Sequence, residues 1–234
     1  PGDTGDDNGE REYDLSDSVT VGVVALQPVK TVVGTSAAHT SGTDVAIGEV
    51  VRYRVAVTVP EGVNDGFAII DELPEFVALH GGGSATVGIY GTDLTVETDL
   101  EDAVSAVECT MAALTAPVFA FPSDRLTPTV HSTVPDAHSQ LEFAIGDIQN
   151  GTLDDTLSCI VIEYDVRILD NAANSNGNDL TNGAAAEANG HRGPAGEATV
   201  TVVEPVLTIT KSVDPQAAAG NADAGDTVTY EVVV

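Results

Sequence analysis

Apolar and polar residues alternate over long stretches of the chain, most regularly where Val51, Tyr53, Val55, Val57 and Val59 occupy every second position. Because successive side chains of a β-strand point to opposite faces, this pattern predicts strands with one buried face. Asn, Asp, Gly and Pro residues separate the runs and predict turns. We expect strands over 18–26, 28–33, 45–59, 67–70, 141–148, 156–169, 180–188 and 198–203.

One segment departs from this alternation. Its apolar side chains recur at four- and three-residue steps, as on one side of a helix, at Leu100, Val104, Val107, Met111 and Leu114. Thr98, with Glu101 three residues later, forms a capping-box pattern at the start of the segment. We therefore expect a helix over about 99–113 that covers a face or an end of a sheet. A proline-rich segment over 115–140 should follow it and be mostly loop, with one short strand.

A longer pattern occurs twice. Lys30 on an apolar strand is followed at 48–53 by Gly-Glu-Val-Val-Arg-Tyr, and Lys211 is followed at 225–230 by Gly-Asp-Thr-Val-Thr-Tyr. These are the only two lysines in the sequence. The interval between the copies is much longer than a solenoid repeat and is about the size of one domain, which indicates a repeated domain.

Many short strands with regular turns predict an all-β fold, an Ig-like antiparallel β-sandwich with one inserted helix. We expect the sandwich to occupy 18–203, with 1–17 as a linker or the end of a preceding repeat. Residues 204–234 then form the first strands of a following repeat. The last alternating run stops at residue 234, as expected for a segment of a longer repeat array.

The composition is strongly acidic, with 37 Asp and Glu residues against 8 Lys and Arg and a formal net charge of −29. Such a charge keeps a protein soluble and repels nucleic acids and anionic membranes. No apolar run is long enough to cross a bilayer. We therefore expect no nucleic-acid partner and no membrane insertion in this segment.

The two cysteines, Cys109 and Cys159, are too few for a disulfide scaffold. In a secreted protein a single bridge between them would close a loop of about 50 residues and contribute about 4 kcal/mol. Alternatively, both residues are small buried hydrophobic side chains. The sequence leaves the two interpretations open.

Several short motifs follow one another between residues 19 and 203. They are Lys30, Gly48 to Tyr53, Ile70-Asp71-Glu72-Leu73-Pro74, Phe143-Ala144-Ile145-Gly146-Asp147, and Asn174 to Gly177 leading into Leu180-Thr181-Asn182-Gly183-Ala184. In this order they resemble the bacterial and archaeal surface repeats known as "domain of unknown function 11" and the related pilin-type domains that form an internal isopeptide bond. The resemblance implies an extracellular or cell-surface location. It also implies neighbouring repeats, copies of the same protein, or a host or cell-surface ligand as partners.

In the isopeptide-forming relatives, a strand lysine joins an asparagine of the last strand with the help of a buried acid. The matching positions are Lys30, Asn182 and Asp71. A lysine enclosed in an apolar core loses its proton more easily, and the neutral amine can attack the side-chain carbonyl carbon of the asparagine. A protonated aspartate can polarise that carbonyl and pass a proton to the departing ammonia.

Other residues compete for these roles. Glu72 is the alternative acid, and the alternative acceptors are Asn174, Asn176 and Asn178. In the alternative interpretation, Lys30 is an exposed strand lysine, and Asp71 and Asn182 are turn residues.

Three further sites follow from local sequence. Asp3, Asp6 and Asp7 are weak calcium candidates, because they lack the alternate spacing of a helix–loop–helix calcium site and a solvated loop is the simpler reading. Calcium is accordingly the one cofactor considered, and otherwise we expect none. Asn150 begins an N-glycosylation sequon in a predicted turn. A metal site at His131, Asp136 and His138 is disfavoured, because Pro135 and the loop context fix no ligand geometry.

The sequence favours a structural repeat of a secreted or cell-surface fibre, adhesin or fimbria-like stalk, assembled in part by strand addition. The alternative is a β-sandwich module that binds a carbohydrate or a protein, although the absence of Trp and the few Tyr and Phe residues weigh against a sugar site. We do not expect an enzyme, since the chain contains no nucleophile elbow and no phosphate-binding glycine loop.

Overall fold

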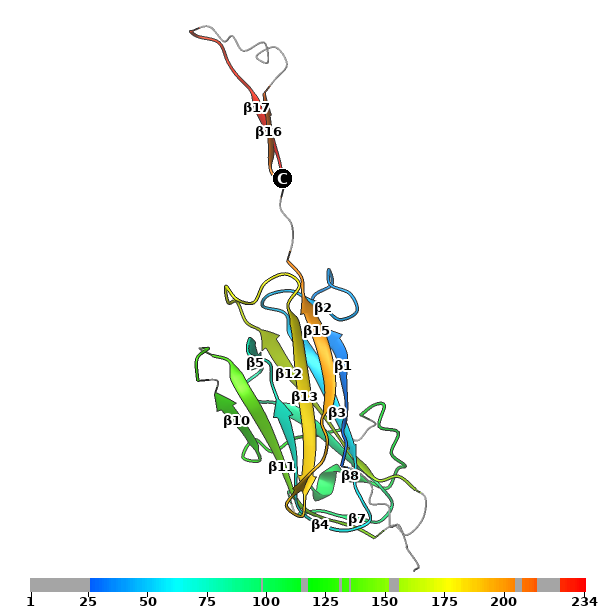
Figure 1. The fold of residues 1–234 in the computed structure, drawn as a ribbon. Coiled ribbons are helices and arrows are strands. Elements are labelled where there is room, and N and C mark those ends of the chain that lie inside the picture. Colours follow the sequence, from blue (N-terminus) through cyan, green and yellow to red (C-terminus); the bar gives the residue numbers. More distant parts are fainter. Residues whose placement is uncertain are drawn as a thin grey trace, which may run out of the picture.

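The computed structural model describes residues 26–97, 99–114, 118–130, 132–134, 136–151, 156–204, 208–213 and 224–234. The fold is almost entirely β: two large sheets form a sandwich, and a separate two-stranded sheet follows near the C-terminus (Figure 1). The expected all-β, Ig-like sandwich is confirmed. The predicted linker 1–17 and all but the last residue of the predicted strand 18–26 lie outside the described residues.

The first sheet is seven-stranded and follows the order β1–β3–β12–β6–β8. Its path consists of β1 (Val29–Thr35), β3 (Val50–Thr58), β12 (Cys159–Ile168), β6 (Ala85–Tyr90) and β8 (Val104–Ser105). Two short strands extend it, with β5 (Val77–Leu79) on β12 and β9 (Phe119–Ala120) on β6. β12 is the central strand, and β1 lies at one edge of the sheet.

The second sheet is eight-stranded and follows the order β10–β11–β4–β13–β15–β2. Its path consists of β10 (Leu126–Val130), β11 (His138–Asn150), β4 (Gly62–Glu72), β13 (Asp179–Ala188), β15 (Gly196–Val202) and β2 (Asp44–Val45). β14 (His191–Arg192) pairs with β13, and β7 (Leu94–Thr95) pairs with β11. All its pairs are antiparallel except β15 with β2.

The core lies between the two sheets, as the alternating pattern predicts. Val55 and Ile162 point inward from the first sheet, and Ile69 and Phe143 point inward from the second, all with no exposed surface. Burial of such side chains contributes about 1.5–3 kcal/mol each and provides the main stabilisation of the sandwich.

The helix predicted over 99–113 is wrong. The segment contains only one turn of 3₁₀-helix, η1 (Glu101–Ala103), and Val104 then takes an extended conformation and pairs with Ile89 of β6. Pairing with an existing sheet therefore overrides the local helical pattern. The apolar stripe is not a single buried face either, because Val107 is 46% exposed.

The structure joins Cys109 and Cys159 by a disulfide, with their Cα atoms 5.7 Å apart. Cys159 begins the central strand β12, so the bridge ties the irregular segment after β8 to the middle of the first sheet. A small apolar cluster surrounds the bridge and consists of Ala56, Tyr90 and Val161. The sequence leaves two interpretations open, and the structure supports the disulfide.

One side of the sandwich is closed by a close approach of β1 to β15. A Cβ atom on Gly196 would overlap the backbone carbonyl of Pro28, and one on Gly193 would overlap that of Leu26. Only glycine allows the two backbones to lie this close. The approach holds the start of β1 against the second sheet, so that Lys30, two residues after Pro28, points into the space between the sheets.

The C-terminal two-stranded sheet, β16 (Thr210–Val213) and β17 (Tyr230–Val233), has the same register as β1 and β3. In the sandwich, the residue two positions after Lys30 pairs with Tyr53. In the C-terminal sheet, the residue two positions after Lys211 pairs with Tyr230. The repeated sequence pattern thus forms the same antiparallel pair twice.

Candidate functional site

Five polar side chains meet in the apolar space between the sheets. Three come from the first sheet, and two come from the second: Lys30 on β1, Tyr53 on β3, Tyr164 on β12, Asp71 on β4 and Asn182 on β13. All five are at most 5% exposed.

Strand register explains why they meet. Tyr53 pairs with Tyr164, and Lys30 pairs with the residue two positions after Tyr53, so the three side chains share the inner face of the first sheet. In the second sheet Asp71 pairs with Ala184, which places Asp71 and Asn182 as diagonal neighbours on its inner face.

The Tyr164 hydroxyl connects the groups of the two sheets. Lys30 Nζ donates a hydrogen bond to the Tyr164 hydroxyl oxygen at 2.7 Å, and Asn182 Nδ2 donates to the same oxygen at 3.1 Å. The hydroxyl itself donates to the Asp71 carboxylate. Lys30 Nζ also forms a direct ion pair with that carboxylate.

Two aromatic rings lie against the lysine. Lys30 Nζ lies 5.0 Å from the centroid of the Tyr53 ring and 5.2 Å from the centroid of the Tyr164 ring. Both distances fall within the range of a cation–π interaction. The rings and the ion pair hold the Nζ atom in one place and keep it away from water.

Burial changes the ionisation of the site. It lowers the pKa of Lys30, and the neighbouring Asp71 carboxylate only partly opposes this effect. Burial also raises the pKa of Tyr164 well above its ordinary value, and the charge of Asp71 raises it further. The site therefore favours loss of the lysine proton while the tyrosine hydroxyl stays protonated.

Three oxygen atoms of the site have no hydrogen-bond partner within the part of the chain that the structure describes: the Tyr53 hydroxyl, Asp71 Oδ1 and Asn182 Oδ1. An unpaired buried acceptor is costly, by about 1–3 kcal/mol. Each atom can accept a hydrogen bond, and Asn182 Oδ1 is the atom on which negative charge would develop if an amine attacked its carbonyl carbon.

The alternative acid and acceptors lie elsewhere. Glu72 is exposed and forms an ion pair with Arg192. Asn174 is buried, but its Nδ2 donates to the backbone carbonyl of Leu169 at 3.1 Å. Asn176 and Asn178 belong to the loop between β12 and β13, away from Lys30. The structure thus brings together Lys30, Asp71 and Asn182.

The sequence did not identify Tyr164 as a member of the site. A signal was present, since alternation over 156–169 assigns residue 164 to one of two faces. That signal could not tell which side chains the opposite sheet would bring to the same place. Only the packing of the sheets places this hydroxyl between Lys30, Asp71 and Asn182.

The fold argues against glycosylation at Asn150, and we correct that expectation. Its side chain is buried, with the residue 3% exposed, and its Nδ2 donates to the backbone carbonyl of Val59 at 2.9 Å. Residue 150 ends β11 and does not lie in a turn. A glycan on this nitrogen would have to break the hydrogen bond and leave the core.

The metal candidates gain no support. Asp3, Asp6 and Asp7 lie outside the described residues, as does His131. His138 accepts a hydrogen bond from the backbone N–H of Leu79 at 3.2 Å. Within the described ranges, no three His, Cys, Asp or Glu side chains are placed to hold a metal ion.

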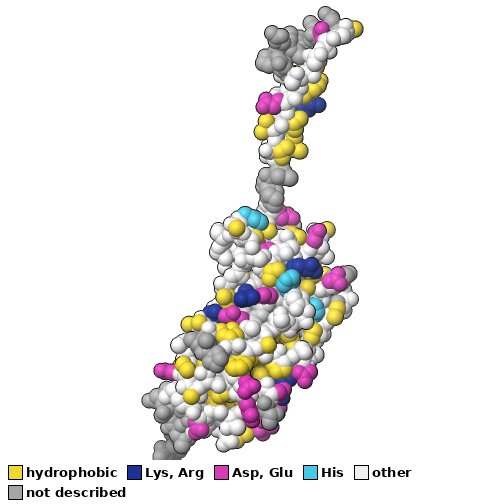
Figure 2. All heavy atoms as spheres, turned by 180° about the vertical axis from the view of Figure 1, so that it is seen from behind, with side chains coloured by type: hydrophobic (Ala, Val, Ile, Leu, Met, Phe, Trp, Pro, Cys, Tyr) yellow, Lys and Arg dark blue, Asp and Glu magenta, His cyan; other side chains and the backbone are white. Residues whose placement is uncertain are grey.

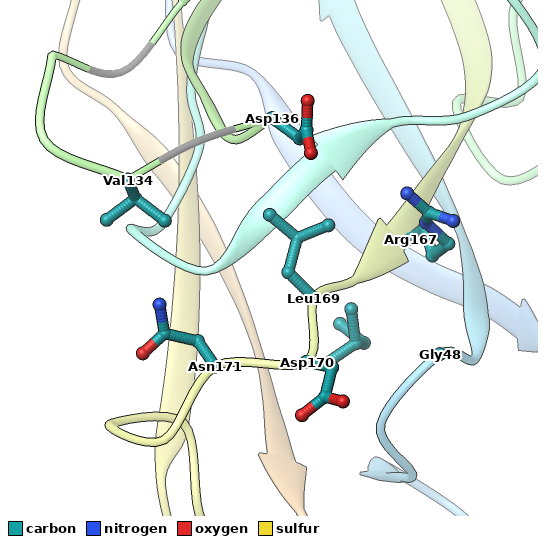
Figure 3. A pocket seen from close by; sticks show the side chains of 8 residues that line it. Gly48, Val134, Asp136, Arg167, Leu169, Asp170 and Asn171 are labelled. Carbon is teal, nitrogen blue, oxygen red and sulfur yellow. The ribbon is translucent and has the colours of Figure 1, made fainter.

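A cavity of about 260 Å³ opens at the end of β12, away from the buried cluster. Figure 3 shows Leu169 near its middle, with Asp136, Arg167 and Asn171 around it. The charged groups that line this cavity are of both signs, and none belongs to the cluster of Lys30.

Acidic side chains are spread over the face of the sandwich seen in Figure 2. This distribution fits the net charge of −29. Among the described residues, no helix has the length and apolar character needed to span a membrane.

Comparisons with known proteins give distant structural neighbours only. No family model matches the chain, and no curated protein matches it. The N-terminal domain of the Streptococcus gordonii adhesin Sgo0707 is 10% identical, with a TM-score of 0.42, and the match covers 75% of this chain and 32% of that one. The pilus backbone RrgB of Streptococcus pneumoniae is 13% identical, with a TM-score of 0.38 and coverages of 69% and 30%.

A collagen-binding domain from a Staphylococcus aureus adhesin is 13% identical, with a TM-score of 0.35 and coverages of 77% and 99%. These neighbours are surface adhesin and pilus domains. The chain spans about a third of the length of the first two.

Proposed function

We propose that this chain is a structural module of a secreted or cell-surface fibre or adhesin, in which an amide bond between Lys30 and Asn182 locks the sandwich. One observation carries the proposal: Lys30 and Asn182 come from opposite sheets and bind the same buried hydroxyl beside Asp71. A lysine, an asparagine and an acid in a dry core are the groups that such a bond requires.

The chemistry begins with the ion pair. Lys30 passes one proton to Asp71, which leaves a neutral amine and a neutral acid, and the burial that lowers the pKa of Lys30 favours this loss. The Nζ lone pair then attacks Cγ of Asn182, and the electron pair of the carbonyl moves to Oδ1. When the carbonyl re-forms, the Cγ–Nδ2 bond breaks and Nδ2 leaves as ammonia. The product is one amide, one ammonia and a protonated Asp71.

The bond would join β1, at the edge of the first sheet, to β13 in the second sheet. A force that pulls on both ends of the sandwich would then pass from residue 30 to residue 182 through a covalent bond. The strands between these positions would carry no load. This property suits a module of a fibre that is under tension.

The second strand pair supports a repeating arrangement. β16 and β17 repeat the register, the lysine and the tyrosine of β1 and β3. We therefore assign 18–203 to one module and 204–234 to the start of the next. The partners are neighbouring modules, or copies of the same protein that add a strand to the exposed pair. The resemblance to the "domain of unknown function 11" repeats belongs to this proposal.

The structure offers less support for a sugar-binding module. Sugar sites use exposed aromatic rings. Here the exposed Tyr230 lies against Lys211, and five other aromatic side chains lie in the core with at most 2% exposure: Tyr53, Phe67, Tyr90, Phe143 and Tyr164.

The test is the intact mass of the whole chain after reduction of the Cys109–Cys159 disulfide. We expect the wild-type chain to be lighter than its sequence by one ammonia, and Lys30→Ala and Asn182→Ala to have their full sequence masses. Lys211→Ala is the matched control, and it should still lose one ammonia. A wild-type chain with its full sequence mass would show that the bond between Lys30 and Asn182 does not form.

A further inference from the structure

We infer that Tyr164 is a catalytic residue of this reaction, whose hydroxyl carries a proton from Asp71 to the departing Nδ2 of Asn182. The inference rests on the proposed amide bond and adds a group that the attack itself does not need. It concerns the step in which ammonia leaves, because an amide nitrogen cannot depart before it gains a proton.

The geometry singles out this hydroxyl. Its oxygen accepts from Lys30 Nζ at 2.7 Å and from Asn182 Nδ2 at 3.1 Å, and its proton is donated to Asp71. It therefore contacts the nucleophile, the leaving nitrogen and the acid at the same time. With one donated and two accepted hydrogen bonds, its bonding capacity is fully used.

The chemistry of the amide explains how Nδ2, which donates a hydrogen bond to the Tyr164 oxygen before the attack, can accept a proton from it afterwards. In the intact side chain the Nδ2 lone pair is delocalised, so this nitrogen only donates. After Lys30 Nζ adds to Cγ, the delocalisation is lost and Nδ2 becomes a basic amine. The same oxygen–nitrogen pair can then serve the opposite transfer, from the Tyr164 hydroxyl to Nδ2.

The proton balance closes at each stage. Lys30 first gives a proton to Asp71, through their direct contact. After the attack, Tyr164 gives its hydroxyl proton to Nδ2 and takes the proton of Asp71 in its place. Ammonia leaves as the carbonyl re-forms, and the new amide nitrogen returns one proton to Asp71. Tyr164 ends as it began, and no outside acid or base takes part.

The surroundings suit a relay. The pKa of Tyr164 is raised by burial and by the charge of Asp71, so the hydroxyl keeps its proton at ordinary pH. The ring is fixed by its neighbours, with the centroid of Phe143 5.3 Å and that of Tyr53 6.1 Å away. A relay group held in this way needs no rearrangement during the reaction.

The chain supplies a matched control. Tyr90, on β6 of the same sheet, is also a buried tyrosine and is 1% exposed. It packs against the Cys109–Cys159 disulfide, outside the cluster of Lys30. Tyr90→Phe therefore removes a hydroxyl from a buried tyrosine of the same sandwich without touching the proposed relay.

The experiment measures the rate of ammonia loss. The whole chain is made by brief cell-free synthesis in the cold, then warmed, and its intact mass is followed with time while circular dichroism reports folding. We expect Tyr164→Phe to react at least about 100-fold more slowly than wild type. Tyr90→Phe should react at nearly the wild-type rate.

The outcomes separate the two proposals. If wild type loses ammonia and a folded Tyr164→Phe does so at the same rate, the relay is overturned and the bond stands. Equal slowing of Tyr164→Phe and Tyr90→Phe also overturns the relay, since packing then explains both. If wild type loses no ammonia, the bond fails and the relay with it.

Should Tyr164→Phe not fold, 3,5-difluorotyrosine at position 164 keeps the hydroxyl and makes it more acidic. A changed rate of ammonia loss then supports the relay, and an unchanged rate overturns it.

Discussion

Two strand pairs of this molecule follow one local plan, yet they occupy opposite environments. In β1–β3 and in β16–β17 a lysine lies over the ring of a tyrosine, with Nζ 5.0 Å from the centroid of Tyr53 in the first pair and 4.2 Å from that of Tyr230 in the second. The motif glycines, Gly48 and Gly225, both have a positive φ, of 83° and 107°. The side chain of Lys30 has no exposed surface, whereas Lys211 is exposed.

The difference shows which part of the site is formed by the local sequence motif alone. The motif itself is enough to form the strand pair, set its register and place the lysine over the tyrosine. The acid, the amide and the second tyrosine come from β4, β13 and β12. A reactive lysine therefore requires the opposite sheet, and the motif alone does not provide it.

Replacing the two lysines in turn should give the largest difference in stability between the two strand pairs. Lys30→Met removes both the cation beside the buried Asp71 carboxylate and the nucleophile of the proposed bond, and we expect the free energy of unfolding to fall by at least about 3 kcal/mol. Lys211→Met removes an exposed side chain, and the loss should stay within about 0.5 kcal/mol. Urea denaturation of both variants measures the two effects, and equal losses would contradict the comparison.

Separating β1 from the second sheet should make the environment of the β1–β3 pair more like that of the exposed β16–β17 pair. Gly196→Ala places a Cβ atom on the carbonyl of Pro28, and we expect a loss of about 1–3 kcal/mol, together with slower loss of ammonia. Gly34→Ala on β1 is the control, because its Cβ would meet no atom within 4 Å. Thermal unfolding and intact mass measure both variants. A harmless Gly196→Ala would show that the close approach is not needed.

The smallest difference in stability between the two strand pairs should come from replacing their acidic motif residues, Glu49 and Asp226. Glu49 is buried, and its carboxylate accepts backbone hydrogen bonds from Ala46 at 2.7 Å and Ala37 at 2.9 Å. We expect Glu49→Gln to cost about 1–2 kcal/mol, and Asp226→Asn, at an exposed position, to cost less.

The effect of Glu49 should also depend on pH. Burial acts to raise the pKa of Glu49, but the hydrogen bonds from Ala46 and Ala37 outweigh it and hold the pKa below its ordinary value of 4.5. The carboxylate therefore stabilises the fold above pH 4.5, and this contribution is lost as the pH falls through the lower folded-state pKa. The gap in melting temperature between wild type and Glu49→Gln should narrow over that fall. A constant gap would contradict this assignment.

The sequence was sufficient for those features that depend on alternation. The long runs that became β3, β12 and β13 pointed to strands with a buried face, and the structure has them. Prediction failed where a distant partner decides the conformation. Val104 follows a helical pattern, but an open edge of β6 draws it into a strand. The Asn150 sequon predicted a turn, but its side-chain amide donates a hydrogen bond to the backbone carbonyl of Val59 in the core.

The site shows the same division. Lys30, Asp71 and Asn182 were indicated by motifs, and the register of two sheets brings them within reach of one another. Tyr164 carried no motif, because its importance depends on a contact across the sandwich. Local sequence identifies strands and reactive residue types, and the packing of the layers determines which of them react.

The burial of Asp71 and Asn182, which have no exposed surface, also bears on the lifetime of the proposed bond. Hydrolysis of an amide needs a water molecule at the carbonyl carbon, and here water would arrive only if the two layers separated. Ammonia, once it has escaped to bulk solvent, is too dilute to reverse the reaction. A joint made in this place would form a single time, as the protein matures, and would then last as long as the fibre.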